Sequence, residues 1–196
     1  REVLGIALRH VGLGDFLARH PRELQALATP ITAPPTEYGA DLLAAVDGLK
    51  GDAAWVALRV RYRRHLVQLA AWDLEHADPI AAVSIVAAAL ADLSGAALDA
   101  SLAVARRDVK FPAEEVAATR LAIIGMGKAG ARELNYVSDV DVIFVGEAGG
   151  LDGESTLADD RAVTIATQLA MQTMRGIHDL ATEPGLWEVD ANLRPE

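Results

Sequence analysis

The sequence predicts an α+β fold in which a helical N-terminal subdomain, residues 1–112, is followed by a strand-containing subdomain, residues 113–196. Hydrophobic residues make up 52% of the 196 residues and aromatic residues only 5%, an alanine-rich balance that favours packed helices over a β-sandwich. Apolar residues recur at helical spacing in the first half. Short apolar runs beside glycine-rich turns appear only after Phe111-Pro112, so we place the boundary there.

The first half is predicted to consist of helices that are separated by proline or glycine. Pro21 interrupts the first helix and begins the second, three prolines between residues 29 and 36 form a loop, and Asp52 and Asp78 precede the two longest helices. The expected helices are 1–20, 21–28, 37–49, 52–77 and 79–107.

Four arginines, Arg59, Arg61, Arg63 and Arg64, lie on the predicted helix 52–77. Such a group is able to face a phosphate or an acidic partner. A solvated helix face is the favoured interpretation, because charged residues ordinarily remain in water.

The second half is predicted to hold three strands, 120–125, 139–145 and 186–193, with a short helix after the first strand and a longer helix at about 156–177. Residues 146–153 contain four glycines and two acidic residues, which is typical of a loop.

Charge and composition narrow the classes of function. The formal net charge of −10 argues against non-specific binding to nucleic acid or to an anionic membrane. No signal peptide opens the sequence, and the longest apolar run, Pro79–Ala91, is too short to span a bilayer. The absence of cysteine excludes disulfides and thiolate metal sites. We therefore expect a cytoplasmic protein with no nucleic-acid or membrane partner.

The stretch from residue 120 to residue 145 carries the chemistry. An apolar strand breaks into the glycine-rich turn Gly125-Met-Gly-Lys-Ala-Gly130, and Ser138-Asp-Val-Asp141 leads into a second apolar run. Residues two apart in a strand share a face, so we expect Asp139 and Asp141 to project together. Two adjacent carboxylates repel each other, and a bound Mg²⁺ with oxygen ligands would offset that repulsion. The pattern indicates phosphoryl or nucleotidyl transfer.

A dinucleotide-binding domain is the alternative interpretation. Gly125-x-Gly127-x-x-Gly130 after a strand matches that fingerprint, and Glu147 stands near the offset of its ribose-binding acid. However, residues 128–137 are short for a crossover helix, and a central parallel strand would not begin with two acids. The metal-binding interpretation is therefore favoured.

A third carboxylate, Asp190, completes an order that resembles a known superfamily. A two-metal site usually needs a third acid. The glycine turn, Ser138-Asp-Val-Asp141 and Val189-Asp-Ala-Asn-Leu-Arg-Pro-Glu196 together resemble the nucleotidyltransferases related to DNA polymerase β. Within that superfamily, these motifs are similar to those of the glutamine synthetase adenylyltransferase/adenylyl-removing family. Arg132-Glu-Leu-Asn-Tyr136 and Phe16-Leu-Ala-Arg-His-Pro21 look more like its N-terminal, adenylyl-removing half.

The resemblance implies a fold and a reaction. The second subdomain is expected to be a palm with a small mixed sheet flanked by helices. The expected reaction is Mg-dependent phosphorolysis, in which AMP leaves an adenylylated tyrosine of glutamine synthetase as ADP. ATP-dependent adenylylation, the reaction of the other half, is the alternative. A module that only docks the synthetase or a signalling protein through its helical half is a further alternative.

The resemblance also assigns residues and partners. Asp139, Asp141 and Asp190 would hold Mg²⁺ and serve catalysis. The predicted phosphate and nucleotide contacts are Lys128, Gly130, Ala131, Ser138 and Arg194. The expected partners are adenylylated glutamine synthetase, phosphate, an adenine nucleotide and, in a full-length enzyme, a PII-type nitrogen-signalling protein.

Two departures from the family pattern are visible. Ala131 stands where the family has the second glycine of a pair, so a positive φ there would be strained. The chain ends at Glu196, where the family continues with a glycine and a basic strand, so we expect the nucleotidyltransferase subdomain to be truncated at its C-terminal end.

Overall fold

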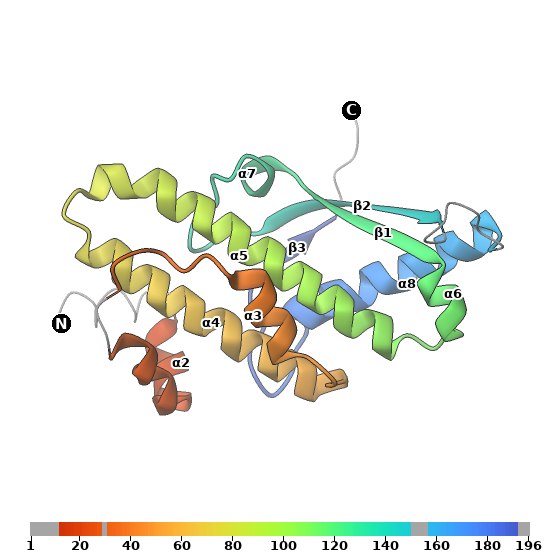
Figure 1. Ribbon diagram of the computed structural model, residues 1–196, viewed down its shortest axis with the longest axis horizontal. Helices are drawn as coiled ribbons and strands as arrows, with labels where there is room; N and C mark the ends of the chain where they lie inside the picture. The colour runs from red at the N-terminus through yellow and green to blue at the C-terminus, as the bar shows by residue number, and fades with distance from the viewer. Residues whose placement is uncertain (1–11, 29–30, 150–156, 192–196) are drawn as a thin grey trace.

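The structure is a computed structural model that describes residues 12–28, 31–149 and 157–191. It is an α+β fold of long helices and one small sheet, as predicted (Figure 1). Its elements are α2 (Leu13–Arg19), the 3-10 helix η1 (Pro21–Leu27), α3 (Tyr38–Ala45), α4 (Gly51–Glu75), α5 (Pro79–Asp108), α6 (Ala113–Ala117), β1 (Thr119–Gly125), α7 (Gly127–Gly130), β2 (Val140–Ala148), α8 (Asp159–His178) and β3 (Val189–Asp190).

The two longest helices, α4 and α5, lie side by side and form the body of the molecule (Figure 1). The predicted start of α5 is confirmed: the Asp78 side chain accepts hydrogen bonds from the amides of Ile80 and Ala81 at 3.1 Å each, and Pro79 occupies the first turn. These contacts satisfy donors that a helix leaves without internal partners. The alanines on the inner side of α5 allow its neighbours to approach closely.

Helix α5 extends beyond the apolar run Pro79–Ala91, which by itself is too short to span a bilayer. At 30 residues it meets the length and apolarity of a membrane span, the one such helix within the described ranges. Half of its most apolar window is buried inside the protein, against α3, α4 and α8. That environment is typical of the core helix of a folded domain.

The sheet has the order β1-β2-β3 and is mixed, as expected. Strand β2 is antiparallel to β1, from Thr119↔Ala148 to Gly125↔Val142, and parallel to β3. The dinucleotide-binding interpretation is therefore wrong. That fold requires parallel strands joined by a crossover helix, whereas here the strands before and after the glycine turn are antiparallel and α7 has four residues.

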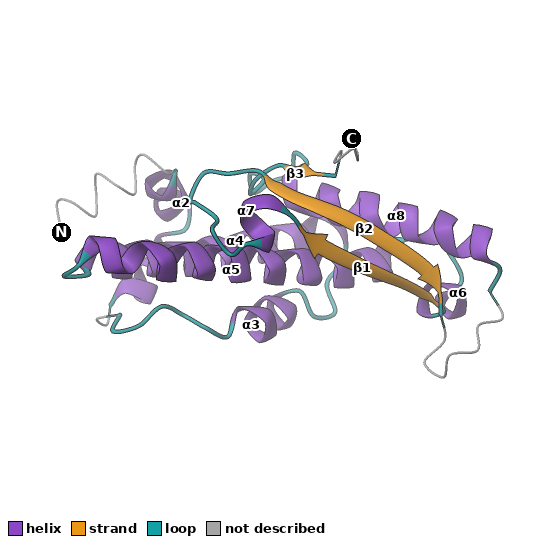
Figure 2. Cartoon of the chain, turned by 90° about the horizontal axis from the view of Figure 1, so that it is seen from above, coloured by secondary structure: helices purple, strands orange, loops and turns teal. Residues whose placement is uncertain are grey.

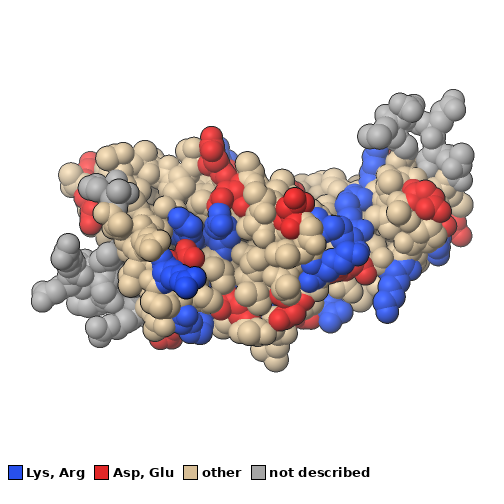
Figure 3. Space-filling view, turned by 60° about the horizontal axis from the view of Figure 1, so that its bottom comes forward, with Lys and Arg blue, Asp and Glu red and all other residues tan. Residues whose placement is uncertain are grey.

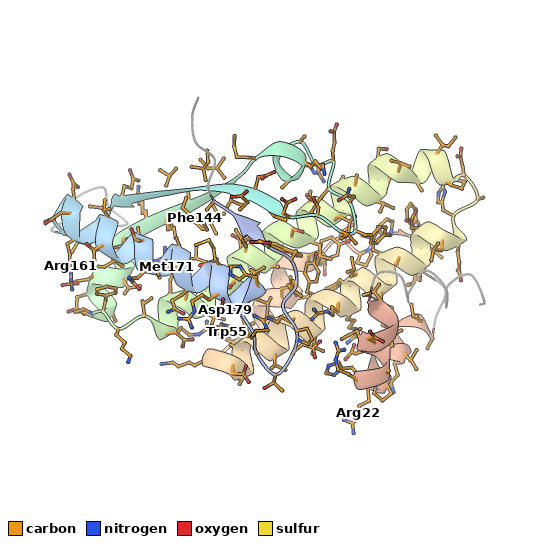
Figure 4. All side chains as sticks on the ribbon, turned by 180° about the vertical axis from the view of Figure 1, so that it is seen from behind. Arg22, Trp55, Phe144, Arg161, Met171 and Asp179 are labelled. Carbon is orange, nitrogen blue, oxygen red and sulfur yellow. The ribbon has the colours of Figure 1, made fainter. Side chains whose placement is uncertain are left out.

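Helix α8 packs on one face of the sheet and α5 lies near its β1 end, whereas none of the described elements covers the other face (Figure 2). On the open face the pairs Ala122↔Val145 and Ile124↔Ile143 lie in register. Ile124 and Val145 are each 47% exposed. On the covered face, Phe144 of β2 lies over α8, where Met171 helps to line an apolar cavity of about 310 Å³ (Figure 4).

Several expectations for individual elements were wrong in detail. Helix α4 begins at Gly51, so Asp52 lies in its first turn and does not cap it, and residues 146–148 belong to β2 instead of a loop. Residues 21–27 form a 3-10 helix instead of an α-helix, and the third strand covers two residues instead of eight. Strand β2 begins at Val140, so Asp139 precedes the strand. Expectations for residues 1–11, 29–30, 150–156 and 192–196 lie outside the described residues. The core runs without interruption from α4 and α5 to Val140 and Val189, and the boundary at residue 112 stays a prediction.

The prediction that the four arginines of α4 form a solvated face is also wrong for two of them. Arg59 has no exposed surface, and its guanidinium donates hydrogen bonds to the carbonyls of Arg175, Gly176 and Glu183 at 3.2, 3.1 and 2.7 Å. Arg63 donates to the Glu183 carboxylate and to the carbonyls of the next two residues. These two arginines fasten the segment between α8 and β3 to helix α4.

Glu183 is the buried acid at the centre of this attachment. Its carboxylate accepts from Arg19 and Arg63 at 3.1 Å each and pairs with His20 at 2.8 Å. Burial raises the pKa of the Glu183 carboxyl, but hydrogen bonds from His20 and Arg19 and the charge of Arg63 outweigh it, so the pKa lies below its ordinary value. The ionised acid is therefore the form that the fold stabilises.

We expect this attachment to weaken in acid. A carboxylate with a lowered pKa stabilises the fold above the pKa of the unfolded chain, about 4.5, and this contribution is lost as the pH falls through the lower folded value. Urea unfolding at several pH values measures the free energy of unfolding of wild type and of Glu183→Gln. The difference between these two free energies should be constant from pH 7 to pH 5. The difference should narrow below pH 4.5. An unchanged difference down to pH 3 would contradict the assignment.

Candidate functional site

The sheet brings two of the predicted carboxylates together. Asp141 of β2 and Asp190 of β3 are register partners in the parallel pair, although they are far apart in the sequence. Register partners on neighbouring strands share a face, and such strands lie about 4.8 Å apart. Asp139 precedes β2 and is exposed, and the Ser138 hydroxyl donates to its carboxylate at 3.4 Å. Asp139 therefore lies just before the strand and not within it.

The glycine turn lies directly against Asp141. The Met126 amide donates to the backbone carbonyl of Asp141 at 2.8 Å, and Gly127 has a φ of 50°. A Cβ on Gly127 would stand 2.7 Å from Oδ2 of Asp141. Gly127 thus combines a left-handed backbone with room for a carboxylate oxygen.

We expect Gly127→Ala to destabilise the fold more than Gly48→Ala. Both glycines have positive φ, but nothing lies within 4 Å of a Cβ on Gly48, which makes it a matched control for backbone strain. Strain of this kind costs about 1–2 kcal/mol. The outer oxygen of the Asp141 side chain can turn aside at modest cost, so this contact should add about 0.5–1 kcal/mol at Gly127. Thermal unfolding of the two variants measures the difference, and equal losses would mean that the contact with Asp141 is unimportant.

The two backbone amides that were predicted to bind phosphate already donate hydrogen bonds within the glycine turn. The amide of Gly130 donates to the carbonyl of Met126 at 2.9 Å, and that of Ala131 donates to Gly127 at 3.0 Å. The helix geometry leaves the amides of the preceding residues, 127–129, without an acceptor in α7. Ala131 has a φ of −78°, so alanine is accommodated there without strain. Phosphate contacts of Gly130 and Ala131 stay a prediction.

The remaining predicted contacts are only partly placed. Lys128, Ser138 and Asp139 line one cavity of about 710 Å³, so the structure brings them to a common space. Lys128 is exposed on α7. Arg194 lies outside the described residues. The roles of Lys128, Ser138 and Arg194 stay predictions.

The fit of Mg²⁺ rests on the donor atoms. The residues that the structure describes include no group of three His, Cys, Asp or Glu side chains gathered closely enough to hold a metal ion. Asp141 and Asp190 nevertheless offer carboxylate oxygens from neighbouring strand positions, the ligand type that Mg²⁺ prefers. The missing side chain of Gly127 leaves room beside Asp141. The donor chemistry fits, and Asp139 is the member that the sheet does not bring into register.

Sequence reasoning missed the residues that join the helical half to this site. The residues not foreseen are Arg59 and Arg63, which share the helix face of Tyr62 and Leu66 at the spacing i, i+3, i+4, i+7. Trp187, between α8 and β3, donates its indole hydrogen to the Tyr62 hydroxyl at 3.0 Å. The surface charges do not mark this site, because basic and acidic side chains are interspersed on the face shown in Figure 3.

Comparisons with known proteins place the chain in a family. Residues 11–196 match the family described as glutamate-ammonia ligase adenylyltransferase. The relative from Leifsonia xyli is 57% identical over the whole of this chain and 21% of its own length. The relative from Streptomyces avermitilis is 45% identical over the whole chain and 18% of its own length. That from Cutibacterium acnes is 40% identical over 94% of the chain and 19% of its own length.

All three relatives carry the name bifunctional glutamine synthetase adenylyltransferase/adenylyl-removing enzyme. The chain spans about a fifth of the length of these curated relatives. The match to the family covers residues 11–196, including the glycine turn and the three aspartates. The chain therefore belongs to the glutamate-ammonia ligase adenylyltransferase family.

Proposed function

We propose that this chain carries a nucleotidyl-transfer site that removes AMP from an adenylylated tyrosine of glutamine synthetase by phosphorolysis. The observation that supports it most directly is the register pair Asp141↔Asp190 beside the glycine turn. Relatives named for both adenylylation and adenylyl removal supply the substrate. The motifs of this chain are more similar to those of the adenylyl-removing half, which favours removal of AMP over its addition.

The reaction exchanges one phosphate ester bond for an anhydride bond. An oxygen of inorganic phosphate attacks the α-phosphorus of adenylyl-tyrosine, the bond from that phosphorus to the phenol oxygen breaks, and ADP forms. The released phenolate takes a proton from water. Phosphate is already ionised at neutral pH, so no side chain has to act as a strong base.

The residues of this chain would bind and orient the reactants. Asp139, Asp141 and Asp190 would hold Mg²⁺, which when bound neutralises charge on the phosphates and on the leaving phenolate oxygen. Lys128 would attract a phosphate from its exposed position on α7. Ser138 would donate a hydrogen bond at the edge of the same space. A PII-type signalling protein remains a proposed partner of the longer enzyme, with the helical half as its docking region.

The test uses adenylylated glutamine synthetase as substrate. The chain, and the longest polypeptide that contains it, are incubated with Mg²⁺ in the presence and absence of inorganic phosphate. We expect ADP to appear only when phosphate is present, with loss of the adenylyl group from the synthetase. Transfer of AMP from ATP to unmodified synthetase would assign this chain the opposite reaction. Inactivity of both polypeptides in both assays would overturn the proposal and favour a docking module.

A further inference from the structure

A cavity of about 710 Å³ lies between the helical half and the carboxylate site. Its volume is in the range of about 300–1,000 Å³ that small-molecule sites occupy. It is walled by α2, α4, α7 and the segments before β2 and β3. Ser138 and Asp139 belong to its lining, whereas Asp141 and Asp190 do not, so the cavity adjoins the predicted reaction site at Asp139. Its lining includes Tyr62, Arg63, Tyr136, Ser138, Asp139 and Trp187.

Two aromatic side chains in the wall are held in fixed positions. The indole hydrogen of Trp187 donates to Tyr62 at 3.0 Å, and the two rings stand edge to face with centroids 6.4 Å apart. The Tyr136 hydroxyl donates to Asp73 at 3.0 Å. With its one donor engaged, the partly exposed indole presents a rigid aromatic surface to the cavity. Such surfaces bind flat rings by stacking, at little entropic cost.

The charges in the wall cancel. Two of the three cations, Arg19 and Arg63, also bind the buried carboxylate of Glu183. Because Glu183 already neutralises these two arginines, their part of the wall favours the uncharged nucleoside portion of a nucleotide over a free phosphate anion. The acids also supply acceptors for hydroxyl and amino groups. The cations are Arg19, Arg63 and Lys128, and the acids are Asp15, Asp139 and Glu188.

We propose that this cavity holds the nucleoside of the adenylyl group, with its base stacked on Trp187 and its α-phosphate directed towards Asp139. This inference rests on the proposed function and deepens it. The phenol ring of the substrate tyrosine is attached to a protein and must approach from an accessible surface. The open face of the sheet, where Asp141 and Asp190 emerge beside exposed Ile124 and Val145, offers that surface. The nucleoside and the protein substrate thus occupy separate sides of the reacting phosphorus.

The three tryptophans of the chain allow a direct test without Mg²⁺ or glutamine synthetase. The indole signals of Trp55, Trp72 and Trp187 are recorded by ¹⁵N–¹H NMR and assigned with single phenylalanine variants. We expect adenosine and ADP to shift the Trp187 signal and leave the Trp55 signal in place. Inorganic phosphate and phosphotyrosine should leave Trp187 unchanged. Trp187→Leu should weaken adenosine binding about tenfold or more, whereas Trp187→Phe, which keeps an aromatic face, should stay within about threefold of wild type.

The outcomes separate this inference from the proposed function. A shift of Trp187 with phosphotyrosine and not with adenosine would assign the cavity to the substrate tyrosine and overturn the inference. No shift with any probe, or equal adenosine affinity in Trp187→Leu, would do the same. Adenosine binding at Trp187 without phosphate-dependent release of ADP would uphold the nucleoside site and reject the phosphorolysis. Unchanged signals of Trp55 and Trp72 in Trp187→Leu show that this variant is folded.

Discussion

Replacing Arg59 by methionine is expected to lower the free energy of unfolding by about 3–5 kcal/mol, because three backbone carbonyls lose a charged hydrogen-bond donor. Arg59 is fully buried and donates to three backbone carbonyls at the end of α8 and in the segment that follows. Methionine fills much of the same volume but donates no hydrogen bond, so buried carbonyls lose their partner. Urea unfolding measures the loss.

Arg64→Met on the same helix is the matched control. Its side chain is 39% exposed, and its ion pair to Glu23 is 3.7 Å long, so the loss should stay below about 1 kcal/mol. Arg59→Lys should fall between the two, because a single ammonium group cannot reproduce the three directions of a guanidinium. Equal stability of Arg59→Met and Arg64→Met would show that the buried contacts contribute nothing.

The attachment made by Arg59 also has a consequence for the site. The segment that it holds leads into β3, which places Asp190 beside Asp141. Hydrogen exchange of amides 182–190 should therefore accelerate in Arg59→Met under conditions where α5 remains protected. Uniform acceleration over both regions would indicate global destabilisation alone.

Asp141→Asn is expected to reduce adenylyl removal by about a thousandfold or more, a loss equivalent to about 4 kcal/mol of transition-state stabilisation. The substitution removes a charge beside the partner position of Asp190 while keeping nearly the same shape. It also relieves repulsion between neighbouring acids, so thermal stability should be unchanged or higher. The assay is release of ADP from adenylylated glutamine synthetase, alongside thermal unfolding.

Glu147→Gln is the matched control for that substitution. Glu147 lies on the same strand, is 64% exposed and pairs with Arg120 at 3.4 Å, away from the carboxylate pair. We expect its activity to stay within about twofold of wild type, since exposed ion pairs contribute little. Persistence of activity in Asp141→Asn would mean that the metal-site assignment is wrong. Loss of stability in that variant would mean that the carboxylate is structural.

Local signals allowed much of the fold to be predicted. Asp78-Pro79 marks the start of α5, and the helix begins there because its first free amides find the Asp78 side chain. The long α4 and the strands β1 and β2 follow from apolar spacing, which depends only on near neighbours in the sequence. The 3-10 form of η1 and the brevity of β3 were not predicted, because packing against distant segments decides such details.

The sequence by itself determined the helical body, the glycine turn and the identity of the acids, because helical periodicity and the choice of residues at turns are properties of short stretches. The tertiary structure decided three things: the antiparallel pairing that excludes a dinucleotide fold, the register that sets Asp190 beside Asp141, and the burial of Arg59. Each depends on contacts between segments far apart in the chain. Such contacts form only where a buried face or a buried charge finds its complement.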